Sequence, residues 1–197
     1  MLNQLRPAIV LIVFSTVLLG LVFPIAFTGA ARVALPFQAG GSLIERDGKP
    51  IGSALIGQDF TSEKYFHPRP SALSGADPKD PSKTVPTPYD AGESGASNLG
   101  PTSKALVERV QADVKSCGMA SVPGDMATTS ASGLDPDISP QSAEAQVDRV
   151  AKARNLPPDQ VRGLIEAHTS GRLLGLFGAP RVNVLQLNLA LDAVGHG

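Results

Sequence analysis

The hydrophobic pattern is dominated by one uninterrupted apolar segment near the start of the chain. The residues from Pro7 to Ala31 carry no charge, and Arg6 and Arg32 flank them. A bilayer core needs roughly 20 apolar residues in a helix, because lipid offers backbone groups no hydrogen-bond partner. The segment therefore predicts one transmembrane helix. One alternative is a cleaved signal peptide, which ends at a small-x-small cleavage site that residues Thr28–Ala30 could imitate. Another is a buried helix of a soluble protein.

After this segment the pattern changes to short apolar runs and then to a polar loop. Two runs within 43–57 flank Asp47-Gly48, a dipeptide typical of tight turns, and predict a β-hairpin with a bulge near Gly52 and Gly57. Residues 61–100 are dense in Pro, Gly, Ser and Asp, which excludes long regular structure. A loop of this length is usually functional or disordered.

Helical periodicity begins at Thr102 or Ser103, either of which can cap a helix reaching about Ser116. The helix carries one apolar stripe, for which we predict ordinary core packing, and Gly118 is placed to end it. The stripe consists of Leu106, Val110 and Val114.

The second half of the chain predicts two more helices. Ser139-Pro140 is an N-cap and first-turn pair that opens a helix to about Arg154, where Asn155 stops it. The next helix opens at Pro158 and ends near Gly171. The apolar faces of the two helices contain Ala143, Val147, Val150 and Ala151, then Val161, Leu164, Ile165 and His168.

Two further segments have strand character. Residues 122–129 predict a short strand, and 181–192 alternate with a period near two, which favours a buried strand. Val184, Leu187 and Leu191 also allow a helix in the second segment. The whole pattern predicts an α+β protein: a cytoplasmic tail at 1–6, a transmembrane helix at 7–31, and one mixed α/β domain at 32–197.

Charge and cysteine content exclude few classes of function. Beyond Arg6 and Arg32, 15 Lys and Arg oppose 18 Asp and Glu, a formal charge of −3 that gives no indication of nucleic acid binding. Cys117 is alone and forms no disulfide within the chain. We interpret it as a small packed residue, and His168, near a helix C-terminus, as a structural histidine.

The sequence contains no evident active site. Gly92-Glu93-Ser94-Gly95-Ala96 lacks the last glycine of a nucleophile elbow and lies in a loop. His67, His168 and His196 are too far apart for a zinc motif, and Gly40-Gly41-Ser42 lacks the lysine of a P-loop. We predict no metal site, no bound cofactor and no catalytic residue. The motif Tyr65–Ala72 is either an aromatic plug that pins the loop to the core or a surface for a partner.

Five segments in the same order together resemble the C subunit of the Kdp potassium-transporting P-type ATPase of bacteria and archaea. The resemblance covers nearly the whole chain. The segments are Tyr65–Ala72, Ser97–Thr102, Ser130–Pro140, Arg149–Arg154 and Pro180–Asp192.

The resemblance implies an accessory subunit of a high-affinity potassium uptake complex in the inner membrane. Its partners would be a potassium-conducting subunit, a catalytic subunit phosphorylated by ATP and a small accessory subunit, with lipid around the anchor. Six residues of tail make an N-in anchor plausible, although the flanking charges are nearly even, so the domain is expected outside the cytoplasm. We expect Gly20 and Ala26, in the helix from Pro7, to pack against the potassium-conducting subunit. Tyr65, Phe66, Arg69 and Asn98 are the expected contacts of the domain.

The family is described as a catalytic chaperone that assists ATP binding, with nucleotide contacts in the part matching Thr128–Leu134. The residues concerned are Thr128, Thr129, Ser130, Ser132 and Gly133. An exterior domain cannot reach cytosolic ATP across roughly 30 Å of hydrocarbon, so such an effect requires coupling between distant sites. The competing hypothesis is a free-standing, membrane-anchored solute-binding domain or hydrolase, which would have a concave apolar pocket.

Overall fold

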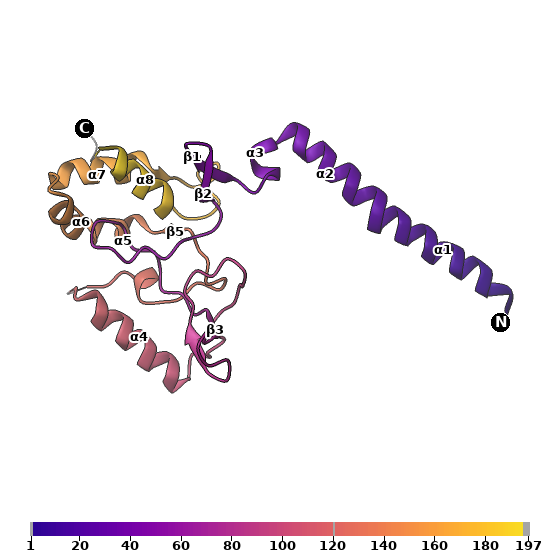
Figure 1. Ribbon diagram of the computed structural model, residues 1–197, viewed down its shortest axis with the longest axis horizontal. Helices are drawn as coiled ribbons and strands as arrows, with labels where there is room; N and C mark the ends of the chain where they lie inside the picture. The colour runs from indigo at the N-terminus through magenta and orange to yellow at the C-terminus, as the bar shows by residue number, and fades with distance from the viewer. Residues whose placement is uncertain (1, 120, 195–197) are drawn as a thin grey trace. The chain divides into compact units, whose positions relative to one another are not determined.

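The computed structural model describes residues 2–119 and 121–194, and the chain divides into two compact units, 1–51 and 52–197. The first unit is mostly one long helix (Figure 1). After the turn η1 (Leu2–Gln4), it runs through α1 (Leu5–Val17), a π-helical turn η2 (Leu18–Val22) and α2 (Phe23–Ala34). The most apolar 18-residue window of Leu5–Ala34 has a mean hydropathy of 2.7, and none of its residues is buried. The predicted helix is confirmed, and it is long and apolar enough to span a membrane.

The π-helical turn has a local cause in the sequence. Pro24 has no N–H to donate to Gly20, four residues earlier, and its ring would collide with that carbonyl in a regular α-helix. The wider turn avoids this collision, and the N–H of Phe23 donates to Leu18 O, five residues back. The helix therefore continues through Pro24 without a break.

The predicted hairpin is present. A short helix α3 (Pro36–Ala39) precedes strands β1 (Leu43–Arg46) and β2 (Lys49–Ser53), which pair with each other. Asp47 and Gly48 have φ angles of 54° and 72°, as a type I′ turn requires. Within the loop at 61–100, the strands β3 (Ser74–Ala76) and β4 (Thr84–Pro86) form a small antiparallel pair that the sequence pattern did not predict.

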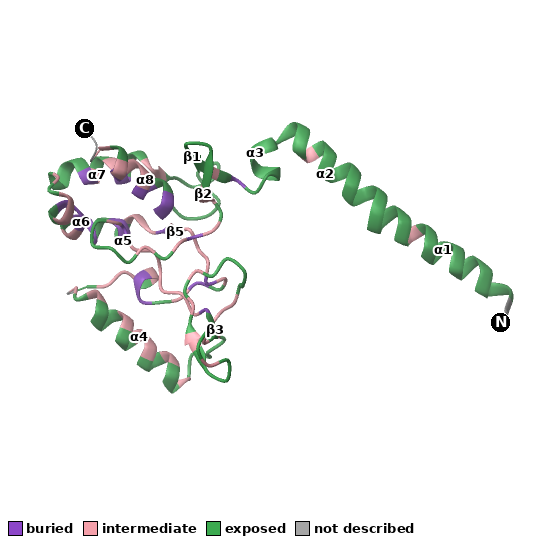
Figure 2. Cartoon of the chain, viewed as in Figure 1, coloured by how far each residue is buried: buried purple, intermediate pink, exposed green. Residues whose placement is uncertain are grey.

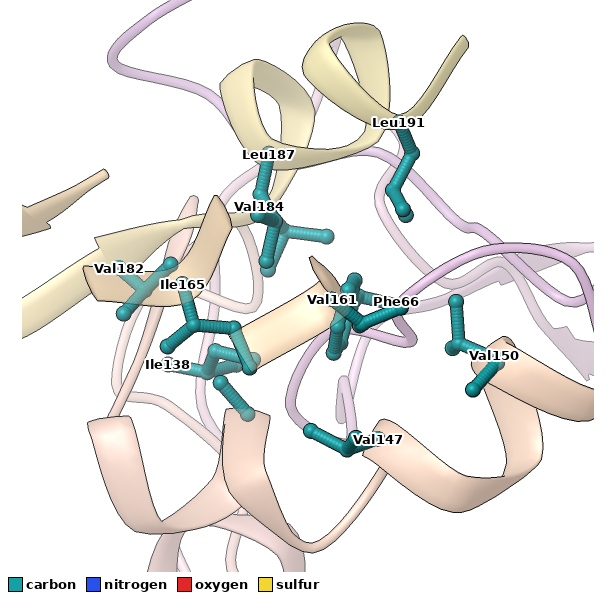
Figure 3. Packing of buried hydrophobic residues seen from close by; sticks show 12 residues of the cluster. Phe66, Ile138, Val147, Val150, Val161, Ile165, Val182, Val184, Leu187 and Leu191 are labelled. Carbon is teal, nitrogen blue, oxygen red and sulfur yellow. The ribbon is translucent and has the colours of Figure 1, made fainter. Parts of the chain in front are cut away.

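The core of the second unit consists of four helices and a small antiparallel sheet. The helices are α5 (Pro140–Glu144), α6 (Val147–Arg154), α7 (Pro158–Ala167) and α8 (Val184–Val194). The sheet has the order β5-β7-β6, with strands Asp137–Ile138, Arg181–Asn183 and Thr169–Ser170. Figure 3 shows how Phe66 from the loop packs among the aliphatic side chains of these elements.

Two predictions about helices in this core need correction. The helix predicted from Pro140 to Arg154 is broken into α5 and α6, because the chain turns at Ala145 and Gln146 and directs the Gln146 side chain inward. The helix α7 ends at Ala167 rather than near Gly171, and Asn155 ends α6 in a left-handed conformation, as predicted.

The strand predicted at 181–192 is wrong for most of its length. Only Arg181–Asn183 is extended, and α8 follows it. Asn183 caps this helix, because its Oδ1 accepts from Gln186 N at 3.1 Å. The buried positions of α8 have helical spacing and are Val184, Leu185, Leu187, Asn188 and Leu191.

Two predictions between the loop and α5 are also wrong. Residues 122–129 form a 3-10 turn, η3 (Gly124–Met126), in place of a strand, since Pro123 and Gly124 favour a turn. The helix α4 (Lys104–Cys117) has the predicted bounds, but all 14 of its residues are partly or fully exposed (Figure 2). Its apolar stripe therefore does not pack in the core, and Val114 is 39% exposed.

Candidate partner interface

Residues 63–69, which we call the strap, are fixed to the core by two buried amide side chains. Phe66 is fully buried, and its N–H donates to Asn188 Oδ1 at 2.8 Å while its carbonyl accepts from Asn188 Nδ2 at 3.0 Å. His67 N donates to Gln146 Oε1 at 2.8 Å, and Gln146 Nε2 donates to His67 O at 3.2 Å. Both backbone groups of Phe66 and of His67 therefore have hydrogen-bond partners, as buried and half-buried backbone groups in folded proteins usually do.

Two arginines of α6 hold the strap from the side. Arg149 Nη1 donates to the carbonyls of Glu63 and Tyr65, at 2.8 and 3.0 Å. Arg154 Nε donates to Lys64 O at 2.6 Å, and its guanidinium lies 4.8 Å from the centre of the Tyr65 ring. Burial lowers the pKa of Arg149, while Glu63 opposes this shift.

The four predicted partner contacts have different surroundings. Phe66 is the aromatic plug and has no exposed surface to offer a partner. Tyr65 is half-buried, with its hydroxyl donating to Asp192 Oδ2 at 3.2 Å, and Arg69 forms an ion pair with Asp135 at 2.8 Å. Asn98 is exposed and has a φ of 52°. The structure therefore brings Tyr65, Phe66 and Arg69 together on the strap, but with mainly structural contacts.

The segment implied to bind nucleotide is part of the internal framework of the second unit. The N–H of Gly133 donates to Ser130 Oγ at 2.9 Å, and the N–H of Leu134 donates to Ser132 Oγ at 3.1 Å. Gly133 O accepts from Ser71 Oγ at 2.9 Å. The amides of Gly133 and Leu134 are thus already engaged. Of the remaining two residues, Thr129 is partly exposed, while Thr128 is exposed with its hydroxyl donating to Gly124 O.

Two clefts lie beside the strap and share Arg69 in their walls. The first, of about 700 Å³, is lined by the strap, the end of α4 and the α5–α6 turn, and includes His67, Cys117 and Arg149. Burial, and then Arg149, lowers the pKa of His67. Burial, and then Asp113, raises the pKa of the Cys117 thiol, which makes it a poor nucleophile.

The second cleft, of about 660 Å³, is lined by three carboxylates and two guanidiniums. Arg69 pairs with Asp135, and Arg181 pairs with Asp137 at 3.0 Å. Burial raises the pKa of Asp137, against the effect of Arg181. Asp125 accepts from Ser139 N at 2.7 Å and from the hydroxyls of Ser139 and Ser142; burial would raise its pKa, but these bonds outweigh burial and lower it. The charged lining residues are therefore largely neutralised, with an excess of one carboxylate.

Neither cleft resembles a metal centre. Among residues 2–119 and 121–194, no three His, Cys, Asp or Glu residues are placed to hold a metal ion. The described surface beside the strap consists of a loop held by several hydrogen bonds and of charges that are largely paired.

Sequence reasoning missed the most exposed apolar feature of the second unit. Between β6 and β7 the chain forms a tight turn, Leu173–Phe177, which we call the apolar tip. Its four large side chains are 64–82% exposed. The signal in the sequence was four large apolar residues around one glycine, with no helical stripe or strand that could bury them.

The proposed membrane contacts Gly20 and Ala26 lie within the long helix. Nothing else in the structure lies within 4 Å of a Cβ placed on Gly20, so this position is open to close approach by another helix. Six residues are not a whole number of helical turns, and the π-helical turn lies between the two positions, so Gly20 and Ala26 do not share one face of the helix.

Comparison with known proteins gives one consistent result. The profile of the family described as "KdpC: K+-transporting ATPase, c chain" matches residues 5–193. A protein of Bradyrhizobium diazoefficiens named potassium-transporting ATPase KdpC subunit is 60% identical, over 98% of both chains. Proteins of the same name from Rhodopseudomonas palustris and Methylobacterium nodulans are 60% and 58% identical, over 98% of this chain and 99% and 98% of theirs.

Proposed function

Since the chain belongs to the KdpC family, the c chain of K⁺-transporting ATPases, we propose that it is a membrane-anchored accessory subunit that braces the potassium-conducting subunit. The observation that carries this proposal is the extent of the match, which includes both the apolar helix and nearly all of the second unit. A relation that covers both units at about 60% identity supports a shared role for both of them.

The proposed partners are the potassium-conducting subunit, the phosphorylated catalytic subunit and the small accessory subunit of one complex. The helix would pack among their membrane spans, with Gly20 allowing close approach. The second unit would lie outside the cytoplasm and present the strap, in which Tyr65 and Arg69 keep some exposed surface. Rigid mounting of this segment supports a bracing role, because a preorganised surface loses little entropy on binding.

We propose that any effect on ATP use is transmitted through the complex. Two observations, together with the proposed placement, favour coupling over direct contact with nucleotide. The amides of Gly133 and Leu134 are engaged by serine hydroxyls, the nearby cleft carries an excess carboxylate that disfavours phosphate, and the proposed placement puts a bilayer between domain and cytosolic ATP.

The bracing role is tested by replacing Tyr65 and Arg69 with Ala while keeping Phe66. Loss of Phe66 would remove a core side chain and confuse unfolding with loss of contact. We expect the double variant to retain less of the potassium-conducting subunit in detergent pull-downs. The control is Lys104→Ala with Glu108→Ala, an exposed ion pair of α4. Equal recovery of the subunit by both double variants would remove the strap from the interface.

The orientation has its own test. Two fusions are made after Gly197, one to a reporter that is active only in the cytoplasm and one to a reporter that is active only outside it. Together they show which side of the membrane the second unit occupies. We expect activity only from the reporter that functions outside. Activity of the cytoplasmic reporter would reverse the proposed topology and reopen direct nucleotide contact.

A further inference from the structure

The apolar tip differs from the rest of the second unit in how its side chains meet solvent. Leu173 and Phe177 pair across the turn, with N–H to carbonyl distances of 2.9 and 3.0 Å in the two directions. They remain 69% and 64% exposed, and Leu174 and Leu176, between them, reach 82% and 74%. Apolar surface therefore extends from the bridged pair Leu173 and Phe177 around the end of the turn.

Exposure of these four apolar side chains to water does not stabilise the turn. Leu174 and Gly175 have φ angles of 53° and 73°, so the turn holds a leucine in the left-handed region that is unfavourable for it. A turn exposing four large apolar side chains gains free energy when a surrounding apolar medium covers them. A flat protein surface would cover only one side, whereas lipid covers a protruding turn on all sides.

The charges around the tip suit anionic lipid headgroups. No Asp or Glu occurs in the sequence between Glu166 and Asp192. Arg172 immediately precedes the tip and is exposed, and Arg181 follows it and stays 55% exposed at its side chain while pairing with Asp137. An apolar surface flanked by arginines is the pattern of segments that lie in the membrane interface.

The tether to the long helix limits how far the tip can lie from a membrane that the helix crosses. The chain from Leu35 to Ile51 spans at most about 60 Å when fully extended, so the second unit stays near the membrane that the helix crosses. The base of the tip is close to the point where the chain enters this unit. Asn183 Nδ2 donates to Ala54 O at 3.0 Å, and only residues 178–182 lie between Asn183 and the tip, which is at most about 20 Å of extended chain.

We propose that the apolar tip inserts into the bilayer surface and gives the second unit a membrane contact of its own, besides the helix. Tethering makes weak insertion sufficient, because the second contact forms within one molecule. The inference depends on the membrane anchorage proposed above but is independent of the partner subunits.

The test uses the full chain in vesicles of phosphatidylcholine and phosphatidylglycerol, with Cys117→Ser as background. An environment-sensitive fluorophore is attached to Leu176→Cys, and, as a control, to Asp159→Cys, whose native side chain is 95% exposed. We expect the label at 176 to be quenched by bromine on the acyl chains and shielded from aqueous iodide. The label at 159 should behave in the opposite way.

Further variants separate the possible outcomes. A label at Ser15→Cys reports the anchor: if it is lipid-quenched while the label at 176 is quenched only by iodide, the tip proposal is wrong and the anchorage stands. Leu174→Ser should reduce acyl-chain quenching at 176 several-fold. In the assembled complex, a photo-crosslinker at 176 should join to lipid. A dominant crosslink to another subunit would overturn lipid as the partner of the tip.

Discussion

Asn188 satisfies both backbone groups of Phe66 within the core, with 1% of its own surface exposed. Replacing it by Leu would leave a buried N–H and a buried carbonyl without partners. We expect Asn188→Leu to lower the free energy of unfolding by about 2–4 kcal/mol. Thermal or urea unfolding measures this, and Gln186→Leu, on the exposed side of the same helix, should change stability by no more than about 0.5 kcal/mol. Equal effects of the two substitutions would contradict the stabilising role of the two hydrogen bonds between Asn188 and Phe66.

The backbone conformation at position 133 requires glycine, independently of any role of the segment in binding. The φ of Gly133 is 71°, and an added Cβ would lie 2.5 Å from Leu73 Cγ and 3.0 Å from Gly95 O. We expect Gly133→Ala to destabilise the protein by about 2 kcal/mol or more. Gly163, within α7, has nothing within 4 Å of such an atom, so Gly163→Ala should stabilise by about 0.5–1 kcal/mol. Melting temperatures that shift in the same direction would refute this distinction.

His67 should make stability depend on pH. Burial, then Arg149, lowers its folded-state pKa, so the unfolded chain binds a proton more readily. The free energy of unfolding should therefore fall as the pH drops below about 6.5, the ordinary histidine pKa. Melting temperatures between about pH 5 and 7.5 should show this decline in the wild type and a flatter profile in His67→Gln. A profile unchanged by the substitution would exclude His67 as its cause.

At the residue scale, the sequence allowed local interactions to be predicted but not distant ones. Ser139 at an N-cap, Gly118 and Asn155 at helix ends, and Asp47-Gly48 in a turn all depend on backbone chemistry within a few residues. The amide clamps of the strap join positions 79 and 122 residues apart. Such pairs have no local pattern, so neither Gln146 nor Asn188 stood out in the sequence.

At the scale of elements, periodicity identified helices well but not the surfaces they cover. The helix α4 has the predicted length and ends at Gly118 as predicted, but Ser103 makes no side-chain capping bond and the apolar stripe does not enter the core. The alternation of leucines predicted a strand at 184–194, where the structure has a helix. Leucines at every second position also fit a helix when its buried face is broad. Tertiary packing, rather than propensity, decided both cases.

The exposure of α4 predicts its dynamics. An element with few buried contacts opens at lower free energy than one in the core. Hydrogen exchange should therefore be faster for the amides of α4 than for those of α8, which has five buried residues. Mass spectrometry of exchanged peptides gives this comparison. Slower exchange in α4 than in α8, for the isolated chain, would show that α4 is more stably held than its exposure implies.

At the scale of the whole molecule, the apolar helix could be predicted in full, because a bilayer constrains sequence strongly over a long segment. The placement of the second unit could not, since Arg6 and Arg32 are nearly symmetric about the helix. The partner contacts stay a prediction: Phe66 of the aromatic motif is buried in the core, and the exposed apolar tip carried no motif that the sequence could reveal.

Two glycines of the long helix have open space around them, and substitutions at these two positions should have different effects on assembly. Gly20 and Gly29 both lack neighbours within 4 Å, but only Gly20 lies in the widened π turn. If Gly20 is where another helix approaches closely, Gly20→Leu should reduce recovery of the potassium-conducting subunit several-fold in pull-downs. Gly29→Leu is the matched control and should leave recovery unchanged. The same loss from both would indicate general disturbance of the helix.

The central claim is that this chain works as one subunit among several in a membrane. It is tested most directly by extracting the full chain from its native membrane in mild detergent and measuring the mass and composition of the particle. We predict a particle that contains the potassium-conducting and phosphorylated subunits together with this chain. A particle containing only the 20.4 kDa chain and detergent would contradict the account.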